Sequence, residues 1–146
     1  MENDNIITTL LKFEMDGYTD EEKKLSATMS TITKLNKKIS ELNKTQKENS
    51  ESIQTYAKEF NNLEKAIDDG ANNIEAVRKQ LEQTKKEIIN LTAENIKLVQ
   101  QQEQARASLE LNVGASNTAQ KSLLSYADVI DELKKGLGNA KKQRNF

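Results

Sequence analysis

Few side chains in this chain have the types and spacing that catalysis or metal binding requires. There is no His and no Cys, so the commonest general base and metal ligand and all thiolate chemistry are missing. The acidic clusters Asp68–Asp69 and Asp20–Glu22 offer too few oxygen ligands for calcium, and turn and helix-cap chemistry explains them better. Tyr18, Tyr56 and Tyr126 are too sparse to stack nucleic-acid bases, and the scattered glycines form no phosphate loop. We therefore expect no enzyme, no cofactor and no metal.

The composition favours long, polar helices over a compact domain. Charged residues make up 31% of the chain and aromatic residues 4%, and there is no Pro to break a helix. The net charge of -1 does not indicate general nucleic-acid binding, and no apolar run is long enough to span a membrane. The acidic segment Met1–Asp4 is no signal peptide, so a cytoplasmic location is expected. The alternative is disorder in isolation, since Asn, Gln, Lys, Glu and Ser dominate.

A heptad repeat runs from Leu25 to Asn112 without an insertion or deletion. We call its a and d positions the seam. The repeat predicts an all-α fold with one long coiled-coil helix, residues 19–112, whose seam binds partner helices. The seam residues on which this oligomer prediction rests are Leu25, Ile32, Leu35, Ile39, Leu42, Ile53, Tyr56, Phe60, Leu63, Ile67, Ile74, Val77, Leu81, Ile88, Leu91, Asn95 and Leu98.

Two places interrupt the seam. Gln46 and Asn49 put polar side chains at successive seam positions, and Gly70 occupies a third position within Asp68–Asn73, which is the best turn candidate of the chain. A turn there would make a helical hairpin with arms at about residues 20–68 and 73–112. Because the heptad phase continues across Gly70, the pattern favours a continuous helix with a kink.

The first residues, 1–18, have a different pattern. Between residues 5 and 15, apolar and β-branched residues alternate, and Asp16–Gly17 follows as a turn, which is typical of a strand. We expect a strand-like docking segment that pairs with another subunit through Ile7, Leu11 and Phe13. The alternative is a short amphipathic helix with an apolar face of Ile6, Leu10 and Phe13. Thr19–Glu22 has the form of a capping box, so the long helix is expected to begin near Asp20.

The last part of the chain, residues 113–146, is expected to be a short helix and a basic tail. The heptad pattern ends near Asn112–Ser116, and Asn117 with Gln120 makes a second possible cap. The apolar stripe of the short helix consists of Leu123, Leu124, Ala127, Ile130 and Leu133. The cations after Glu132 suit a solvated helix end; an anionic partner is the alternative.

The number of helices in the coiled coil stays open. Ile at many a positions, Leu at many d positions and Asn95 favour a parallel dimer. In such a dimer, however, Glu59 would face Glu64. The apolar stripe is also widened beyond the seam, which suits three or more helices, by Ala57, Ala66, Ala71 and Val99.

The segments Lys34–Thr45 and Lys79–Ile88 are rich in Lys, Asn, Glu and Leu. With the initial strand-like segment, they make residues 5–112 similar to the N-terminal region of the tail tape measure proteins of tailed phages. The resemblance carries no functional residues. It implies a helical ruler in the virion, or in the host cytoplasm during assembly, as the leading part of a longer protein. Its partners would be the tail tube, a tail chaperone or the baseplate.

Three non-enzymatic functions follow. The first is a ruler or assembly scaffold, whose length would track the number of heptads. The second is a tethering or adaptor coiled coil, such as a cytoskeletal or secretion-apparatus component, with a defined partner. The third is a small hairpin adaptor or chaperone, which requires the chain to reverse near Gly70.

Overall fold

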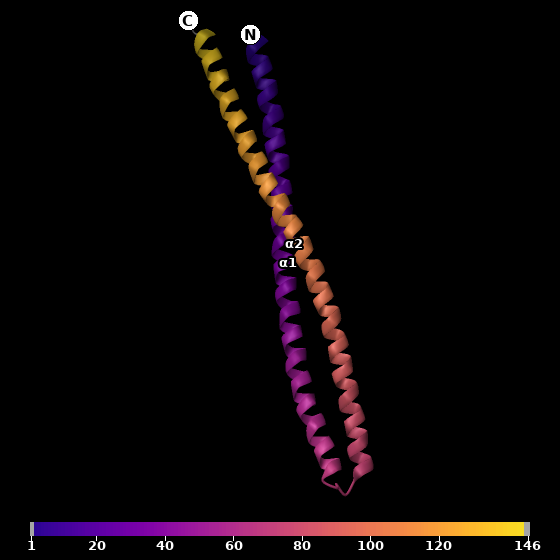
Figure 1. Ribbon diagram of the computed structural model, residues 1–146. Helices are drawn as coiled ribbons and strands as arrows, with labels where there is room; N and C mark the ends of the chain where they lie inside the picture. The colour runs from indigo at the N-terminus through magenta and orange to yellow at the C-terminus, as the bar shows by residue number, and fades with distance from the viewer. Residues whose placement is uncertain (1, 145–146) are drawn as a thin grey trace. The chain divides into compact units, whose positions relative to one another are not determined.

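The computed structural model describes the backbone of residues 2–144 and the side chains of residues 5–140. It contains the helices α1, Glu2–Asp68, and α2, Ile74–Arg144 (Figure 1). The prediction of an all-α fold is confirmed. The chain divides into two units. The terminal unit comprises Met1–Lys34 and Ser108–Phe146, and the turn unit comprises Leu35–Ala107.

A glycine-capped turn separates the helices. Gly70 has a φ of 77°, a left-handed conformation that glycine adopts without a Cβ penalty. The Gly70 amide donates to the Ile67 carbonyl at 3.1 Å, and the Ala71 amide donates to the Ala66 carbonyl at 3.0 Å. This bond pair is the Schellman motif, which satisfies the last carbonyls of a helix. Asn73 then caps α2, because its carbonyl accepts the first helical bond from the Val77 amide at 3.1 Å.

The prediction of one continuous helix across Gly70 is therefore wrong. The heptad phase continues through residues 69–73, but phase only reports which face of each helix is apolar. Each arm of a hairpin needs its own apolar face, and nothing prevents the two faces from sharing a phase. The hairpin that the sequence left as the alternative is the observed connection.

The predicted N-terminal strand is also wrong, because residues 2–18 belong to α1. Ile7, Leu11 and Tyr18 are half-buried and continue the seam toward the N-terminus at heptad spacing. Apolar residues at successive positions satisfied the alternating and the helical pattern together, and packing against α2 selects the helix. The Thr19 hydroxyl does not cap a helix start; it donates to the Met15 carbonyl within α1 at 3.0 Å.

The predicted short C-terminal helix is part of α2 instead. Asn112–Ser116 lies inside the helix, and neither Gly136 nor Gly138 ends it. Ser116 and Ala119 are buried, at 4% and 7% exposure, and they occupy the next a and d positions after Asn112. The break was expected because small and polar residues replaced Leu and Ile there. The predicted basic tail beyond residue 140 lies outside the described side chains.

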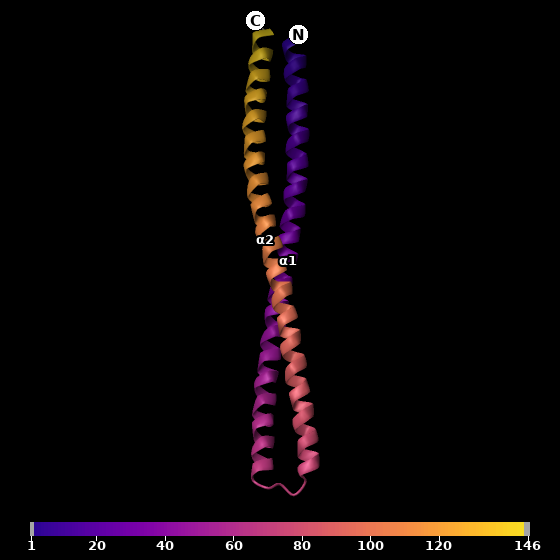
Figure 2. The ribbon, with the colours of Figure 1, turned by 45° about the vertical axis from the view of Figure 1, so that its right-hand side comes forward.

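Within each unit the two arms run antiparallel and side by side, in both views (Figures 1 and 2). In the terminal unit, the Ser116 hydroxyl lies 3.6 Å from the Met29 sulfur, and Ile7 lies over Gly136. In the turn unit, Gln46 and Gln102 are hydrogen-bonded at 3.0 Å. Among the described residues, no large side chain is fully buried. In a seam between only two helices, the large side chains remain partly exposed to solvent.

Candidate interaction site

The predicted seam residues lie between the arms of a single chain. Leu42 is buried at 9% exposure and Ile74 is exposed at 38%, while the other predicted seam residues are half-buried. Their role in contacts between chains stays a prediction, because here they pack α1 against α2 within each unit. The sequence predicted which face of each helix is apolar. Because the chain turns at Gly70, the other arm of the same chain covers that face.

The predicted docking residues of the terminal unit separate onto two faces of α1. Ile7 and Leu11 are half-buried in the seam, whereas Phe13 is 70% exposed. Phe13 shares the outer face with Ile6 and Leu10, which are 57% and 47% exposed. We call Ile6, Leu10 and Phe13 the α1 outer stripe. It is the helical face that the sequence offered as the alternative to a strand.

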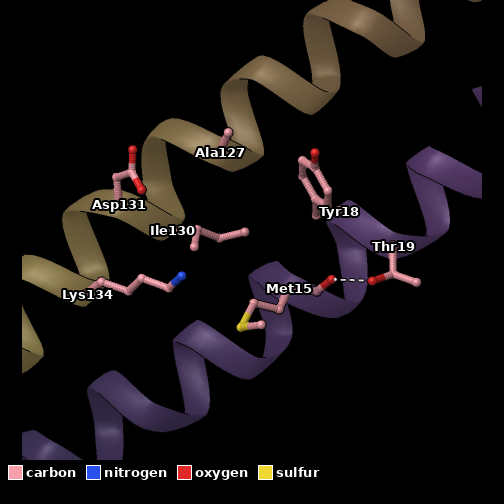
Figure 3. A pocket seen from close by; sticks show the side chains of 7 residues that line it. All are labelled: Met15, Tyr18, Thr19, Ala127, Ile130, Asp131 and Lys134. Atoms are coloured by element: carbon pink, nitrogen blue, oxygen red, sulfur yellow. Dashed lines mark hydrogen bonds between the residues drawn. The ribbon is translucent and has the colours of Figure 1, made fainter.

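A groove opens beside the seam in the terminal unit (Figure 3). Met15 and Tyr18 of α1 face Ile130 of α2 across it, and Asp131 and Lys134 lie at its rim. Its lining is mostly apolar. No group of three or more His, Cys, Asp or Glu side chains suited to a metal ion occurs among the described residues. The groove fits an inserted apolar side chain better than a reacting substrate.

Tyr126 approaches α1 closely in the same unit. A Cβ added to Gly17 would lie 2.6 Å from the Cε1 atom of the Tyr126 ring. Gly17, which the sequence suggested as a turn residue, instead provides space for an aromatic ring inside a helix.

A polar cluster joins the arms of the turn unit. The side-chain amide of Gln46 donates to the side-chain oxygen of Gln102 at 3.0 Å. The side-chain amide of Gln102 donates in turn to the side-chain oxygen of Asn43. The side-chain amide of Asn95 donates to the backbone carbonyl of Gln46 and to the Ser50 hydroxyl, each at 3.4 Å. The members of the cluster are Asn43, Gln46, Ser50, Asn95 and Gln102. Two buried side-chain atoms, Oδ1 of Asn95 and Nδ2 of the nearby seam residue Asn49, have no hydrogen-bond partner.

This polar cluster specifies how the arms pair. A buried polar group that loses its partner costs about 1–3 kcal/mol, so sliding one arm would place Gln102, 6% exposed, against apolar neighbours. A polar residue in a coiled-coil seam is known to set register at a cost in stability. The sequence marked Gln46, Asn49 and Asn95 as polar seam positions, but it could not show that Gln46 and Asn95 meet across a hairpin.

The turn unit also has exposed apolar residues on α2. Ile89, Ile96 and Val99 are 55%, 57% and 42% exposed. A groove beside them is lined by Ile53 of α1 and by Asn95, Ile96 and Val99 of α2. These side chains lie next to the seam and are not used by it. Among them, only Val99 was expected from the sequence to widen the apolar stripe.

Comparisons with known proteins assign no function to the chain, so its function is inferred from the surfaces described above. No family model, no curated protein and no solved structure matches the chain. Neither described helix has an apolar stretch long enough to cross a bilayer. The resemblance to tape measure proteins stays a prediction.

Proposed function

We propose that the chain is a non-enzymatic assembly element, a coiled-coil hairpin that acts as a tether or adaptor between structural proteins. The observation that carries the proposal is the α1 outer stripe. The seam of the hairpin is occupied by the second arm, yet Ile6, Leu10 and Phe13 remain outside it at helical spacing, with Phe13 70% exposed.

The energetics support a role in association. Burying a Phe, Leu or Ile side chain is worth about 1.5–3 kcal/mol, and the thin seam leaves that energy unused in the α1 outer stripe. Residues spaced at i, i+4 and i+7 are the anchors by which a helix enters an apolar groove of a partner. The expected partner is therefore a protein with such a groove, or with an amphipathic helix of its own.

The ruler function is less well supported than the tether. A ruler converts residues into length along an uninterrupted helix, and here the chain reverses at residues 69–73. A scaffold in a phage tail, with the tail tube, a chaperone or the baseplate as partners, remains a proposal from the resemblance. Deleting one heptad from each arm tests it, because only a ruler shortens its assembly in proportion.

A photo-cross-linking experiment tests the tether or adaptor function. Benzoylphenylalanine would replace Phe13 in one variant and Lys23, an exposed residue on the outer side of α1, in the control. In cells that express the chain from its own gene, we expect position 13 alone to cross-link one discrete protein, identified by mass spectrometry. Its binding to the purified chain should then be lost in F13S. Equal adducts at both positions, or none, would contradict the proposal.

A further inference from the structure

One face of α2 in the turn unit has a self-complementary order of side chains. Its residues are spaced alternately by three and four positions, which keeps them on one side of a helix. All are exposed. We call this set the α2 outer stripe: Glu82, Lys85, Ile89, Thr92, Ile96, Val99, Glu103 and Arg106.

Antiparallel pairing of two such stripes matches opposite charges. Residues equally far from the centre of the stripe meet when two copies are related by a two-fold axis. Lys85 of one copy then faces Glu103 of the other. Glu82 likewise faces Arg106.

The middle of the antiparallel pair is apolar. Ile89 would face Val99 of the second copy, and Thr92 would face Ile96. The Thr92 hydroxyl already donates to the Ile88 carbonyl at 2.7 Å, so it needs no partner in the interface. A parallel pair would instead place Lys85 on Lys85 and Glu103 on Glu103, and like charges select against wrong arrangements.

The charges of the stripe are free to make these contacts. Among the described residues, the only ion pair joins Glu21 and Lys24 at 3.5 Å, and that pair is in the terminal unit. Beside the stripe, the groove lined by Ile53, Asn95, Ile96 and Val99 can receive apolar side chains of a second helix.

We propose that two copies of this chain associate antiparallel through the α2 outer stripes of their turn units. The inference rests on the proposed assembly function and names a second copy as one of its partners. The contact extends over roughly 36 Å of helix at 1.5 Å per residue. It is one helix wide, so we expect a weak interface and a dissociation constant in the micromolar range.

Charge reversal with rescue tests the proposal on the full chain. Sedimentation equilibrium of the wild-type chain over a concentration series should give a monomer–dimer equilibrium. K85E and E103K each place like charges together at two symmetric positions, so each should raise the dissociation constant roughly tenfold. The double variant K85E/E103K exchanges the charges and should restore dimerisation. K86E changes the charge equally at an exposed neighbouring position outside the stripe and should have no effect.

Cysteine cross-linking tests the orientation, and the chain has no native Cys to interfere. A mixture of E82C and R106C chains should form a mixed disulfide, and E82C alone should not. A wild-type chain that stays monomeric at several hundred micromolar would overturn the inference. Charge reversals without effect, or a disulfide in E82C alone, would do the same. None of these results bears on cross-linking at Phe13, so failure here is distinguishable from failure of the tether or adaptor function.

Discussion

Replacing Gly70 with Ala tests whether the chain reverses at this residue. A left-handed turn and a continuous helix predict changes of opposite sign in the free energy of unfolding. Gly70 has a φ of 77°, and an added Cβ would meet nothing within 4 Å, so the cost is confined to the backbone. A left-handed conformation costs a residue with a Cβ about 1–2 kcal/mol, and the lower entropy of the unfolded chain offsets about 0.4–1 kcal/mol of that. We expect G70A to lower the free energy of unfolding by about 1 kcal/mol. In a continuous helix, the same change would raise it by about 1 kcal/mol.

The matched control is Gly114→Ala. Gly114 lies inside α2, and an added Cβ there also has nothing within 4 Å. G114A should therefore stabilise the chain by about 0.5–1 kcal/mol. Urea unfolding followed by far-ultraviolet circular dichroism, at a concentration where the chain is monomeric, measures both changes. If G70A stabilised the chain as much as G114A, the glycine-capped turn would be refuted.

Two further substitutions probe the contacts between the arms. The buried Nδ2 atom of Asn49 has no hydrogen-bond partner, so N49L should raise the free energy of unfolding by about 1–3 kcal/mol in the same assay; a loss of stability would mean that this atom is satisfied. Gly17→Ala should give up to about 1 kcal/mol less stability than G114A, because its Cβ would lie 2.6 Å from the Tyr126 ring, which has to move. In a Tyr126→Leu background that difference should disappear, and its persistence would place the conflict elsewhere.

The heptad pattern allowed the helical faces to be predicted but not the connection between them. Leu25 and Leu42 in α1, like Ile88 in α2, lie at the recurring positions that form the seam side of each helix, which is a local property of the sequence. Whether that side meets another chain or the second arm depends on Gly70, where a helical and a left-handed glycine differ by a small free energy. The predicted helix cap at Thr19 was wrong for a related reason. The Thr19 hydroxyl could accept from a nearby amide or donate to a nearby carbonyl, and because α1 continues through Thr19 it donates to the Met15 carbonyl.

Contacts across the hairpin were beyond prediction from the sequence. The polar cluster depends on bringing Asn43 and Gln46 against Gln102, and these residues become neighbours only after the arms pair antiparallel. The exposed Phe13 could have been anticipated, since the amphipathic helix considered as the alternative places it with Ile6 and Leu10. The short alternation between Asn5 and Met15 was too brief to separate the two periods.

The buried positions of the hairpin have consequences for which substitutions it tolerates. In the turn unit, Thr84 and Ala105 are each 4% exposed, and in the terminal unit Ser116 and Ala119 are 4% and 7% exposed. The distance between packed helices depends on the side chains at their contact, so these small residues keep the arms close. An added methylene there would force the arms apart locally, whereas exchanging a half-buried Leu for Met is a mild change. Mutational sensitivity should therefore peak at the smallest residues of the seam, and its large hydrophobic residues should vary more freely.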